Sequence, residues 1–403
     1  MSKSLLIKAG NIFLGTSDKD VMDNAFILVR ENKILYVGDK PPSGEYDIMD
    51  LDGFFVMPGM IDLHVHLSSS GEPNYTSRIT ETTEYQALKA YSNAEKALQS
   101  GFTTLRDVGA SGMQVISLKK AINSGLVQGP RIFAAGRMIT ETGGHGDTPF
   151  GSGRVCDGAD EVRKAVREQI KAGADLIKLS VSGGGMSPQD SPDEPQFTVE
   201  EISVAVQEAH SKHRRVAAHA QSNIGIKNAL RAGVDTIEHA LYLDEESCKM
   251  IVAQNRIIVP TMISPFLTAT YGKNAGVPEW ALAKTQMALE PHKMSVNLAN
   301  NMGVKIGFGT DAGTPFNYHG LNGREFECLV VRGGLTPGQA LYAATGIAAE
   351  ALGKNDSLGT ISAGKLADII AINGNPLTDI KVLADPTNVR FVMLNGQVVK
   401  SAS

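Results

Sequence analysis

The chain has 403 residues, of which 42% are hydrophobic, and its formal net charge is −5 without a basic or acidic block. This length suits a large barrel with an appended domain, and the absence of a basic stripe argues against a nucleic-acid partner. No apolar run approaches the roughly 18 residues of a membrane span, and the three scattered cysteines predict no disulfide framework. With no signal-peptide pattern at the N-terminus, we expect a cytoplasmic protein.

Both ends of the chain predict short β-strands rather than helices. The strand candidates begin near Leu5, Asn24, Ile34, Asp368, Val389 and Gln397. Glycine, aspartate and proline separate them, and Asn395-Gly396 is a hairpin turn signal. We therefore predict one composite β-sandwich domain built from residues 1–57 and 359–403.

Residues 58–358 alternate between apolar strand candidates and helical patterns. After the opening strand, strand candidates begin at residues 103, 131, 176, 216, 236, 257 and 304, and helical patterns include 81–99, 159–172, 199–213 and 280–302. This alternation predicts parallel βαβ units, and about eight of them fit a (β/α)8 TIM barrel. The alternative is a doubly wound open sheet, which would more often show a glycine-rich phosphate loop after its first strand; the sequence has none there.

The opening strand of the predicted barrel ends in two histidines one residue apart, His64 and His66. Residues i and i+2 of a strand share a face, so both imidazoles can reach one point in space. Neutral imidazole is a common ligand for zinc and similar ions. On its own, the pattern fits a metal site and an exposed strand end equally well.

Four more ligand-type side chains fall late in later strands: Lys178, His219, His239 and Asp311. The C-terminal ends of barrel strands meet at one mouth, where active sites lie, so the six side chains form a stronger signal together. Burial of Lys178 in its apolar strand favours a neutral amine, which can take up carbon dioxide to give a carbamate that bridges two cations. The alternatives are a lysine that reaches solvent, core histidines, and a helix N-cap at Asp311. Three histidines in predicted helices are interpreted as surface or packing residues: His210, His213 and His292.

Together these residues resemble the amidohydrolase superfamily. The resemblance covers nearly the whole chain and rests on Pro58–His66, Lys178, His219, Gly233–His239, Gly309–Asp311 and the closing motif Gly359–Ile369. Within the superfamily, the chain most resembles the prolidase-like or Xaa-Pro dipeptidase branch, which includes aminoacyl and N-acyl amino-acid hydrolases.

The resemblance implies two divalent metal ions, which we expect to be zinc, bridged by N6-carboxylated Lys178 and a hydroxide. It places the first pair of ligands on His64 and His66, and the histidines of the second metal on His219 and His239. The catalytic aspartate of the branch, also a metal ligand, corresponds to Asp311.

Further residues are candidates for substrate binding. His145 lies in a glycine-rich loop, and Tyr242 lies three residues after His239; similar residues bind the substrate carbonyl in this branch, while plain loop structure is the alternative. Arg154 has the chemistry to hold a substrate carboxylate, judged from loop position alone. Residues 264–278 hold prolines and glycines, and we interpret them as a mobile loop over the mouth, or equally a plain surface excursion.

We therefore predict a binuclear metal hydrolase that cleaves an amide bond of a dipeptide or N-acyl amino acid with metal-bound hydroxide. Aryl amides, carbamates and ureas are alternative substrates for the same chemistry. A mononuclear deaminase would call for a glutamate in a His-x-x-Glu pattern, where this chain reads His219-Ala-Gln-Ser. A non-catalytic scaffold would have lost ligands, and none is missing. We expect a small-molecule amide substrate, no nucleic-acid or membrane partner, and a homo-oligomer.

Overall fold

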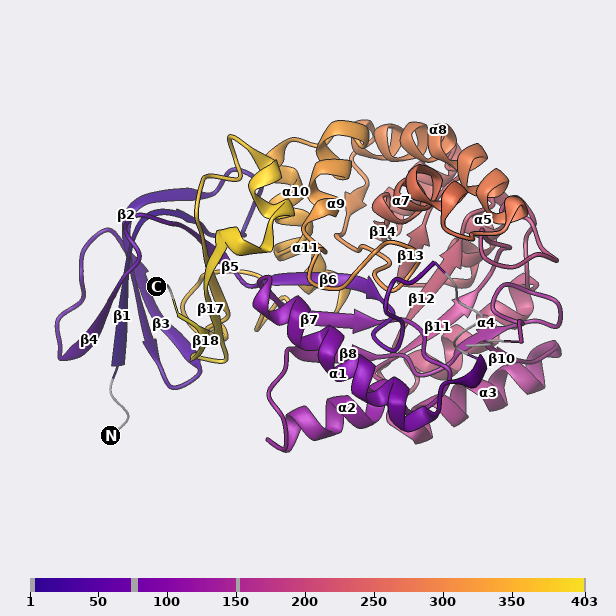
Figure 1. Cartoon of the computed structure of the whole chain (residues 1–403), viewed down its shortest axis with the longest axis horizontal. Helices are drawn as coiled ribbons and strands as arrows, with labels where there is room; N and C mark the ends of the chain where they lie inside the picture. The colour runs from indigo at the N-terminus through magenta and orange to yellow at the C-terminus, as the bar shows by residue number, and fades with distance from the viewer. Residues whose placement is uncertain (1–3, 74–78, 150–152, 402–403) are drawn as a thin grey trace.

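The computed structural model describes residues 4–73, 79–149 and 153–401. It shows a barrel surrounded by helices and, at its side, a sheet that contains both ends of the chain (Figure 1). The strands of this terminal sheet are β1 (Ser4–Phe13), β2 (Val21–Arg30), β3 (Lys33–Gly38), β4 (Tyr46–Asp50), β5 (Phe55–Pro58), β16 (Ile369–Ile372), β17 (Val389–Leu394) and β18 (Gln397–Lys400). The predicted fold class is confirmed.

The terminal sheet is held together where β16 inserts between β5 and β17. Its order is β18-β17-β16-β5-β1-β2-β3, with β4 paired to β1. Ile369 lies opposite Pro58 of β5 on one side and Met393 of β17 on the other. Figure 1 shows the indigo and yellow strands side by side. Phe391 and Met393 are fully buried in a core shared with β1 and β2, so the two ends of the chain stabilise each other.

The barrel is built from parallel strands in chain order. They are β6 (Met60–Val65), β7 (Phe102–Asp107), β8 (Arg131–Ala134), β11 (Leu176–Ser180), β12 (Arg215–Ala220), β13 (Thr236–His239), β14 (Ile257–Val259) and β15 (Lys305–Ile306). A hydrogen bond from Asp175 N to Ala134 O (2.8 Å) joins β8 to β11, and one from Leu63 N to Phe308 O (2.9 Å) closes the ring at β6. The structure has a strand at every strand candidate of the central region. The prediction succeeded because continuous apolar runs are typical of strands covered on both faces.

Helices pack around the barrel, and two short strands, β9 (Met138–Thr140) and β10 (Gly153–Val155), extend its sheet beside β11. The helices are α1 (Thr83–Gln99), α2 (Gln114–Asn123), α3 (Gly158–Ala172), α4 (Val199–His210), α5 (Asn223–Ala232), α6 (Glu245–Ala253), α7 (Ile263–Tyr271), α8 (Glu279–Asn301), α9 (Arg324–Glu327), α10 (Pro337–Ala343) and α11 (Gly346–Ala351). Short 3-10 or π turns are η2 (Gly272–Asn274), η3 (Cys328–Arg332), η4 (Ile380–Ala384) and η5 (Pro386–Asn388). Within the described ranges, no helix combines the length and apolar character needed to cross a membrane.

Residues 264–278 are not the irregular loop that the sequence suggested. The first half of this segment belongs to the helix α7. The prolines and glycines of the segment suggested irregular structure, but Pro265 falls in the first turn of the helix, where proline is tolerated. The buried carboxylate of Glu325 accepts hydrogen bonds from Met262 N (2.9 Å) and Ile263 N (2.6 Å) and thereby caps the helix from a distant segment. The sequence near α7 gives no sign of this contact.

Candidate active site

His64, at the end of β6, is held in place by a buried ion pair between Glu238 and Arg106. Its Nδ1 lies 2.7 Å from Oε2 of Glu238, and Glu238 also pairs with the guanidinium of Arg106 at 2.7 and 2.9 Å. Both oxygens of Glu238 accept hydrogen bonds from Arg106, so the contact with His64 is best made by a donating Nδ1–H. The lone pair of Nε2 is then left for a ligand.

His66 is oriented in the same way. Its Nδ1 donates to the carbonyl oxygen of Gly109 (2.9 Å), and its Nε2 lies 3.1 Å from Oδ1 of Asp311.

Asp62, in the same strand as His64, accepts hydrogen bonds from His64 N (3.1 Å) and Thr310 Oγ1 (2.7 Å). It therefore ties β6 to the segment that carries Asp311. Burial raises the pKa of Asp62 to about 6.

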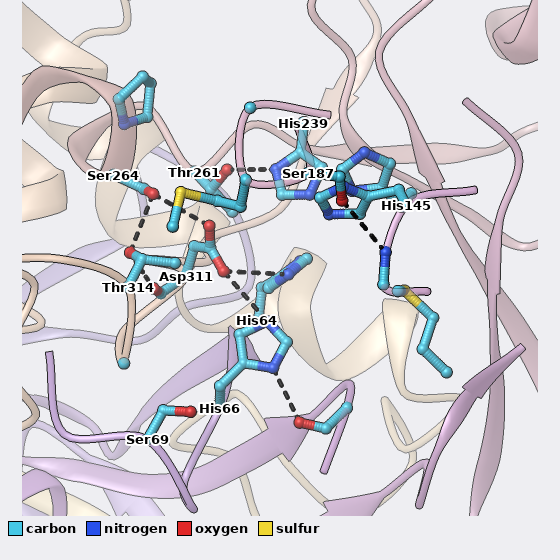
Figure 2. Close-up of a pocket in the computed structure, with 18 of the residues that line it drawn as sticks. His64, His66, Ser69, His145, Ser187, His239, Thr261, Ser264, Asp311 and Thr314 are labelled. Atoms are coloured by element: carbon cyan, nitrogen blue, oxygen red, sulfur yellow. Dashed lines mark hydrogen bonds and ion pairs between the residues drawn. The ribbon is translucent and has the colours of Figure 1, made fainter. Parts of the chain in front are cut away.

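Asp311 completes a group that is suited to a metal ion. Its Oδ1 lies 3.1 Å from His66 Nε2 and 3.5 Å from His64 Nε2, and one ligand atom from each of the three residues lies within 4.8 Å of the others. Figure 2 shows the two rings and the carboxylate pointing toward one another. Gly309 allows this approach, since a Cβ there would lie 2.9 Å from Cβ of His64. Burial alone would raise the pKa of Asp311, but hydrogen bonds from His66 and Ser264 hold it below its ordinary value.

Lys178 lies in the middle of β11 with only 2% of its surface exposed. Its Nζ is buried and has no hydrogen-bond partner among the described residues. Burial lowers the pKa of Lys178 to about 8, since the interior disfavours the charged form. A lysine amine in this state is far more reactive toward carbon dioxide than an ammonium group in water.

His219 and His239 bring their rings to the same cavity. The ring centroids are 4.5 Å apart, and that of His239 lies 4.8 Å from the His64 ring. Nδ1 of His239 lies 2.7 Å from Thr261 Oγ1, and Nε2 of His219 lies 3.2 Å from Gly183 O. Burial lowers the pKa of both imidazoles well below the ordinary value, so both stay neutral, as metal ligands must be.

His145 reaches the cavity from the glycine-rich loop after β9. Its ring stacks on that of His219, with centroids 4.2 Å apart and planes 19° apart. Nδ1 of His145 lies 3.2 Å from Ser187 Oγ and 3.7 Å from Oδ2 of Asp190. The loop after β11 can lie this close only because residue 184 is glycine: a Cβ there would lie 2.4 Å from Nδ1 of His145.

The two remaining sequence candidates stand apart from these residues. Arg154 lies on β10, and its Nε donates to Glu168 Oε2 at 2.8 Å, so its guanidinium already has a carboxylate partner within the chain. Tyr242 follows β13, where its backbone N donates to Gln221 O (3.0 Å). Burial raises the pKa of the Tyr242 hydroxyl. Neither side chain is among the described residues that line the cavity.

Backbone strain gathers at the same end of the barrel. His239, Ala240, Thr261 and Asp311 all have φ between 53° and 68°, the left-handed region that residues other than glycine rarely adopt. Each such residue costs on the order of 1–3 kcal/mol and persists only where the surrounding structure enforces it. Three of these four residues line the cavity: His239, Thr261 and Asp311.

The cavity at the mouth has a volume of about 220 Å³ and contains all six predicted metal ligands together with His145. Sequence reasoning missed several residues that support them, because their contacts join distant segments: Glu238, Thr261, Ser264 and Ser187. The role of Glu238 was the easiest of these to foresee from the sequence, since a glutamate next to a histidine in a buried strand requires a partner. His292, interpreted as a surface or packing residue, is buried and lines the cavity, and its Nε2 lies 2.9 Å from His239 O.

The donor set fits a metal centre. His64 and His66 each use Nδ1 for a protein acceptor and keep Nε2 for the cavity, which is how metal-bound histidines are usually oriented. The buried amine of Lys178 lacks any partner within the described part of the chain, although buried polar groups are nearly always satisfied. A carbamate on Nζ that contacts metal ions would remove this deficit.

Comparison with known proteins agrees with the geometry. The amidohydrolase family model matches residues 55–399. This chain belongs to the amidohydrolase family. It is a metal-dependent hydrolase of carbon–nitrogen bonds, and its metal-binding group contains His64, His66 and Asp311.

Several relatives match over almost the full length. Ochratoxinase from Aspergillus niger is 33% identical over 430 residues, which cover 99% of this chain and 87% of that protein. A crystal structure of a Xaa-Pro dipeptidase with methionine bound in its active site is 37% identical, with a TM-score of 0.92 and coverage of 99% and 100%. A prolidase complexed with N-methylphosphonate-L-proline is 33% identical, with a TM-score of 0.91 and the same coverage.

Proposed function

We propose that this amidohydrolase cleaves the amide bond between an acyl or aminoacyl group and a free amino acid. The proposal includes two divalent metal ions, expected to be zinc, and N6-carboxylated Lys178 as the group between them. The observation that carries it is the buried Nζ of Lys178, which has no partner among the described residues and lies in a cavity with four histidines and an aspartate. The dipeptidase and prolidase among the relatives support the substrate class.

Each of these side chains has a role in the proposed site. His64, His66 and Asp311 would hold one metal, His219 and His239 the other, and Lys178 would bridge the two. When bound, such ions polarise the substrate carbonyl and lower the pKa of water toward about 7. The ring hydrogen bonds of His64 and His66 keep their Nε2 atoms aimed at the metal position before any ion arrives.

Asp311 is the proposed proton carrier. Its two carboxylate oxygens have different environments, because Oδ1 faces the histidines and Oδ2 accepts a hydrogen bond from Ser264. A carboxylate beside the attacking water can accept its proton and pass it to the leaving amine.

His145 is the proposed donor to the oxygen of the scissile carbonyl. A hydrogen bond aimed at the developing negative charge stabilises the transition state more than the ground state. Ser187 can donate its hydroxyl proton to Nδ1 of His145, which would leave the proton of the neutral ring on Nε2, on the cavity side. Tyr242 was predicted as a second donor from its place three residues after His239, but its side chain is not among the described residues that line the cavity, so His145 is the donor that we propose.

The test is steady-state kinetics of the metal-loaded enzyme on a panel of dipeptides and N-acyl amino acids. The panel also contains aryl amides, carbamates and ureas, together with adenosine- and guanine-type amines. We expect cleavage of at least one amide with a free amino acid as the leaving group. Ammonia release from the amines without cleavage of any amide would refute the proposal, and activity confined to carbamates or ureas would reassign the substrate class.

A further inference from the structure

Glu325 is a buried acid to which the proposed function gives no part. It lies on α9, it is fully buried, and it is not among the described residues that line the cavity. Burial raises the pKa of its carboxyl group well above the ordinary value, and the nearby carboxylates of Asp62 and Asp311 act in the same direction. Burying an acid close to two others is costly, so its presence calls for a specific interaction.

That interaction is with the first amides of α7. Each carboxyl oxygen of Glu325 accepts one hydrogen bond, from Met262 N at 2.9 Å and from Ile263 N at 2.6 Å. Met262, the N-cap residue, makes no side-chain hydrogen bond that could cap the helix from within. Glu325 therefore supplies from a distant segment both acceptors that this end of the helix needs.

The two residues that Glu325 holds lie between two side chains that support metal ligands. Thr261 directly precedes them, and its Oγ1 lies 2.7 Å from Nδ1 of His239. Ser264 directly follows them, and its Oγ donates to Oδ2 of Asp311 at 3.0 Å. Figure 2 shows each hydroxyl group beside its ligand. In the proposed site, His239 and Asp311 belong to different metal ions, so one corner of the chain orients a ligand of each.

The backbone of this corner needs support from outside. Thr261 has a φ of 55°, in the left-handed region that β-branched residues rarely adopt, and such a conformation persists only where its surroundings enforce it. The hydrogen bond from Ser264 N to Thr261 O is long, at 3.3 Å, so the turn itself contributes little. The two shorter hydrogen bonds to Glu325 are therefore the stronger support.

We propose that Glu325 is a positioning residue for both metal ions of the proposed site. It acts through the corner formed by residues 261–264 and touches neither substrate nor metal. The inference rests on the proposed function, which assigns His239 and Asp311 to two ions. Without both backbone contacts, the two hydroxyl groups of the corner lose their fixed places beside these ligands. Loss of an outer contact to a metal ligand typically lowers metal affinity or activity by about 10- to 100-fold.

The experiment replaces Glu325 by glutamine. The amide keeps the size of the side chain and one acceptor oxygen, but its NH2 group cannot accept the second backbone hydrogen bond. Glu327→Gln, which removes a partly exposed carboxylate from the same helix, is the matched control. Zinc affinity is measured by competition with a chelator, and kcat and KM are measured at saturating zinc on the best amide of the kinetic panel.

A double-mutant cycle with Ser264→Ala separates positioning from general destabilisation. If Glu325 acts on Asp311 through the hydroxyl group of Ser264, its replacement should cost little more once that hydroxyl group is gone. Urea unfolding of the metal-free proteins shows whether the fold persists. If Glu325→Gln does not fold, Glu325→Asp takes its place in every measurement, because its side chain is one methylene too short to keep both backbone contacts.

We expect Glu325→Gln to lower zinc affinity by about 10- to 100-fold and kcat by about tenfold, with KM within about twofold. In the Ser264→Ala background, the further loss of kcat should be less than about threefold, and Glu327→Gln should behave as wild type. Wild-type zinc affinity in the Glu325 variant, or losses of kcat that multiply in full, would overturn the inference. A wild type that cleaves no amide of the panel overturns the proposed substrate class, and zinc affinity then tests the inference separately.

Discussion

Ser264 Oγ donates a hydrogen bond to Oδ2 of Asp311 at 3.0 Å, while Oδ1 of the same carboxylate lies 3.1 Å from His66 Nε2. Thr314 Oγ1 lies 2.9 Å from Ser264 Oγ and donates to the backbone oxygen of Asp311 at 2.7 Å. Figure 2 shows both hydroxyl groups beside the carboxylate. One oxygen of Asp311 is therefore directed at the metal position by the hydrogen bond that the other oxygen accepts.

Ser264→Ala should lower kcat about tenfold and leave KM within about twofold, because it removes a hydrogen bond to the charged carboxylate of Asp311. Ser264→Thr keeps a hydroxyl group and should retain most of the activity. Thr268→Ala, one turn later on α7 and also at the cavity wall, is the control. A Ser264→Ala enzyme with wild-type kcat, measured at saturating substrate, would show that Asp311 needs no such support.

Asp311→Asn should lower kcat by about 10²–10⁴-fold, because an amide cannot accept and return the proton. The fold should persist, since the Asp311 N to His64 O hydrogen bond (2.7 Å) uses the backbone alone. Metal content measured by mass spectrometry should remain near the wild-type value. If the variant keeps its metals and is as fast as wild type, the proton carrier is another group.

Lys178→Ala should lose most of its bound metal, because the proposed bridging carbamate cannot form. Short carboxylic acids added to the variant should restore part of the metal content and activity, since a carboxylate can fill the space left by the side chain. Elemental analysis of wild type grown with bicarbonate and zinc should approach two equivalents, and Lys212→Ala, at an exposed position, should match it. A Lys178→Ala protein that keeps two equivalents would refute the bridging role.

Acid should destabilise the metal-free protein through His292. Burial lowers the pKa of this imidazole to about 4, against an ordinary value of 6.5. Below pH 6.5 the unfolded chain binds a proton that the folded chain does not. The stability conferred by the neutral ring is therefore full above pH 6.5 and is lost as the pH falls toward 4, at up to about 1.4 kcal/mol per pH unit.

Urea unfolding of metal-free wild type and His292→Gln at pH 7 and pH 5 measures this effect. The free energy of unfolding of the wild type should fall more between the two pH values than that of the variant, by about 2 kcal/mol at most. His319, whose pKa burial also lowers to about 4, is present in both proteins and cancels from the comparison. Equal pH dependence would show that His292 becomes protonated in the folded state.

Deletion of residues 359–403 should make the protein insoluble. It removes β16 from beside β5 and takes Phe391 and Met393 out of the core of the terminal sheet, which leaves an unpaired edge and exposed apolar side chains. A chain that stops after Lys400 keeps every described strand and is the control. Soluble, active protein without residues 359–403 would contradict our prediction that residues 1–57 and 359–403 form one domain.

The sequence was sufficient to predict the features of the fold and the site that depend only on residue spacing within a strand and on the order of the strands. His64 and His66 share one face because they are two residues apart, and Lys178, His219 and His239 interrupt apolar strands whose C-terminal ends meet in any parallel barrel. These relationships need no knowledge of loop conformation. The barrel and the residues around its cavity were predictable for that reason.

What the sequence could not predict depends on contacts between segments far apart in the chain. Lys284 lies in a helix, and nothing near it indicates that its ammonium group contacts the loop of Ser187 and Asp190. Arg154 is close in sequence to the glycine-rich loop of His145, yet Glu168 of the next helix is its partner. In both cases the fold of the loops, rather than the residue type, determines which charge faces the cavity.

The pairing of β16 with β5 also imposes an order on events at the ribosome. The partner of β5 leaves the ribosome roughly 300 residues later, which corresponds to about 15–60 s at ordinary rates of synthesis. During that interval the hairpins of β1, β2 and β3 can form, but one edge of β5 has no strand to pair with. The nascent chain therefore exposes an open β-edge next to the metal-binding histidines of β6 until translation is almost complete, and chaperones have this interval in which to bind it.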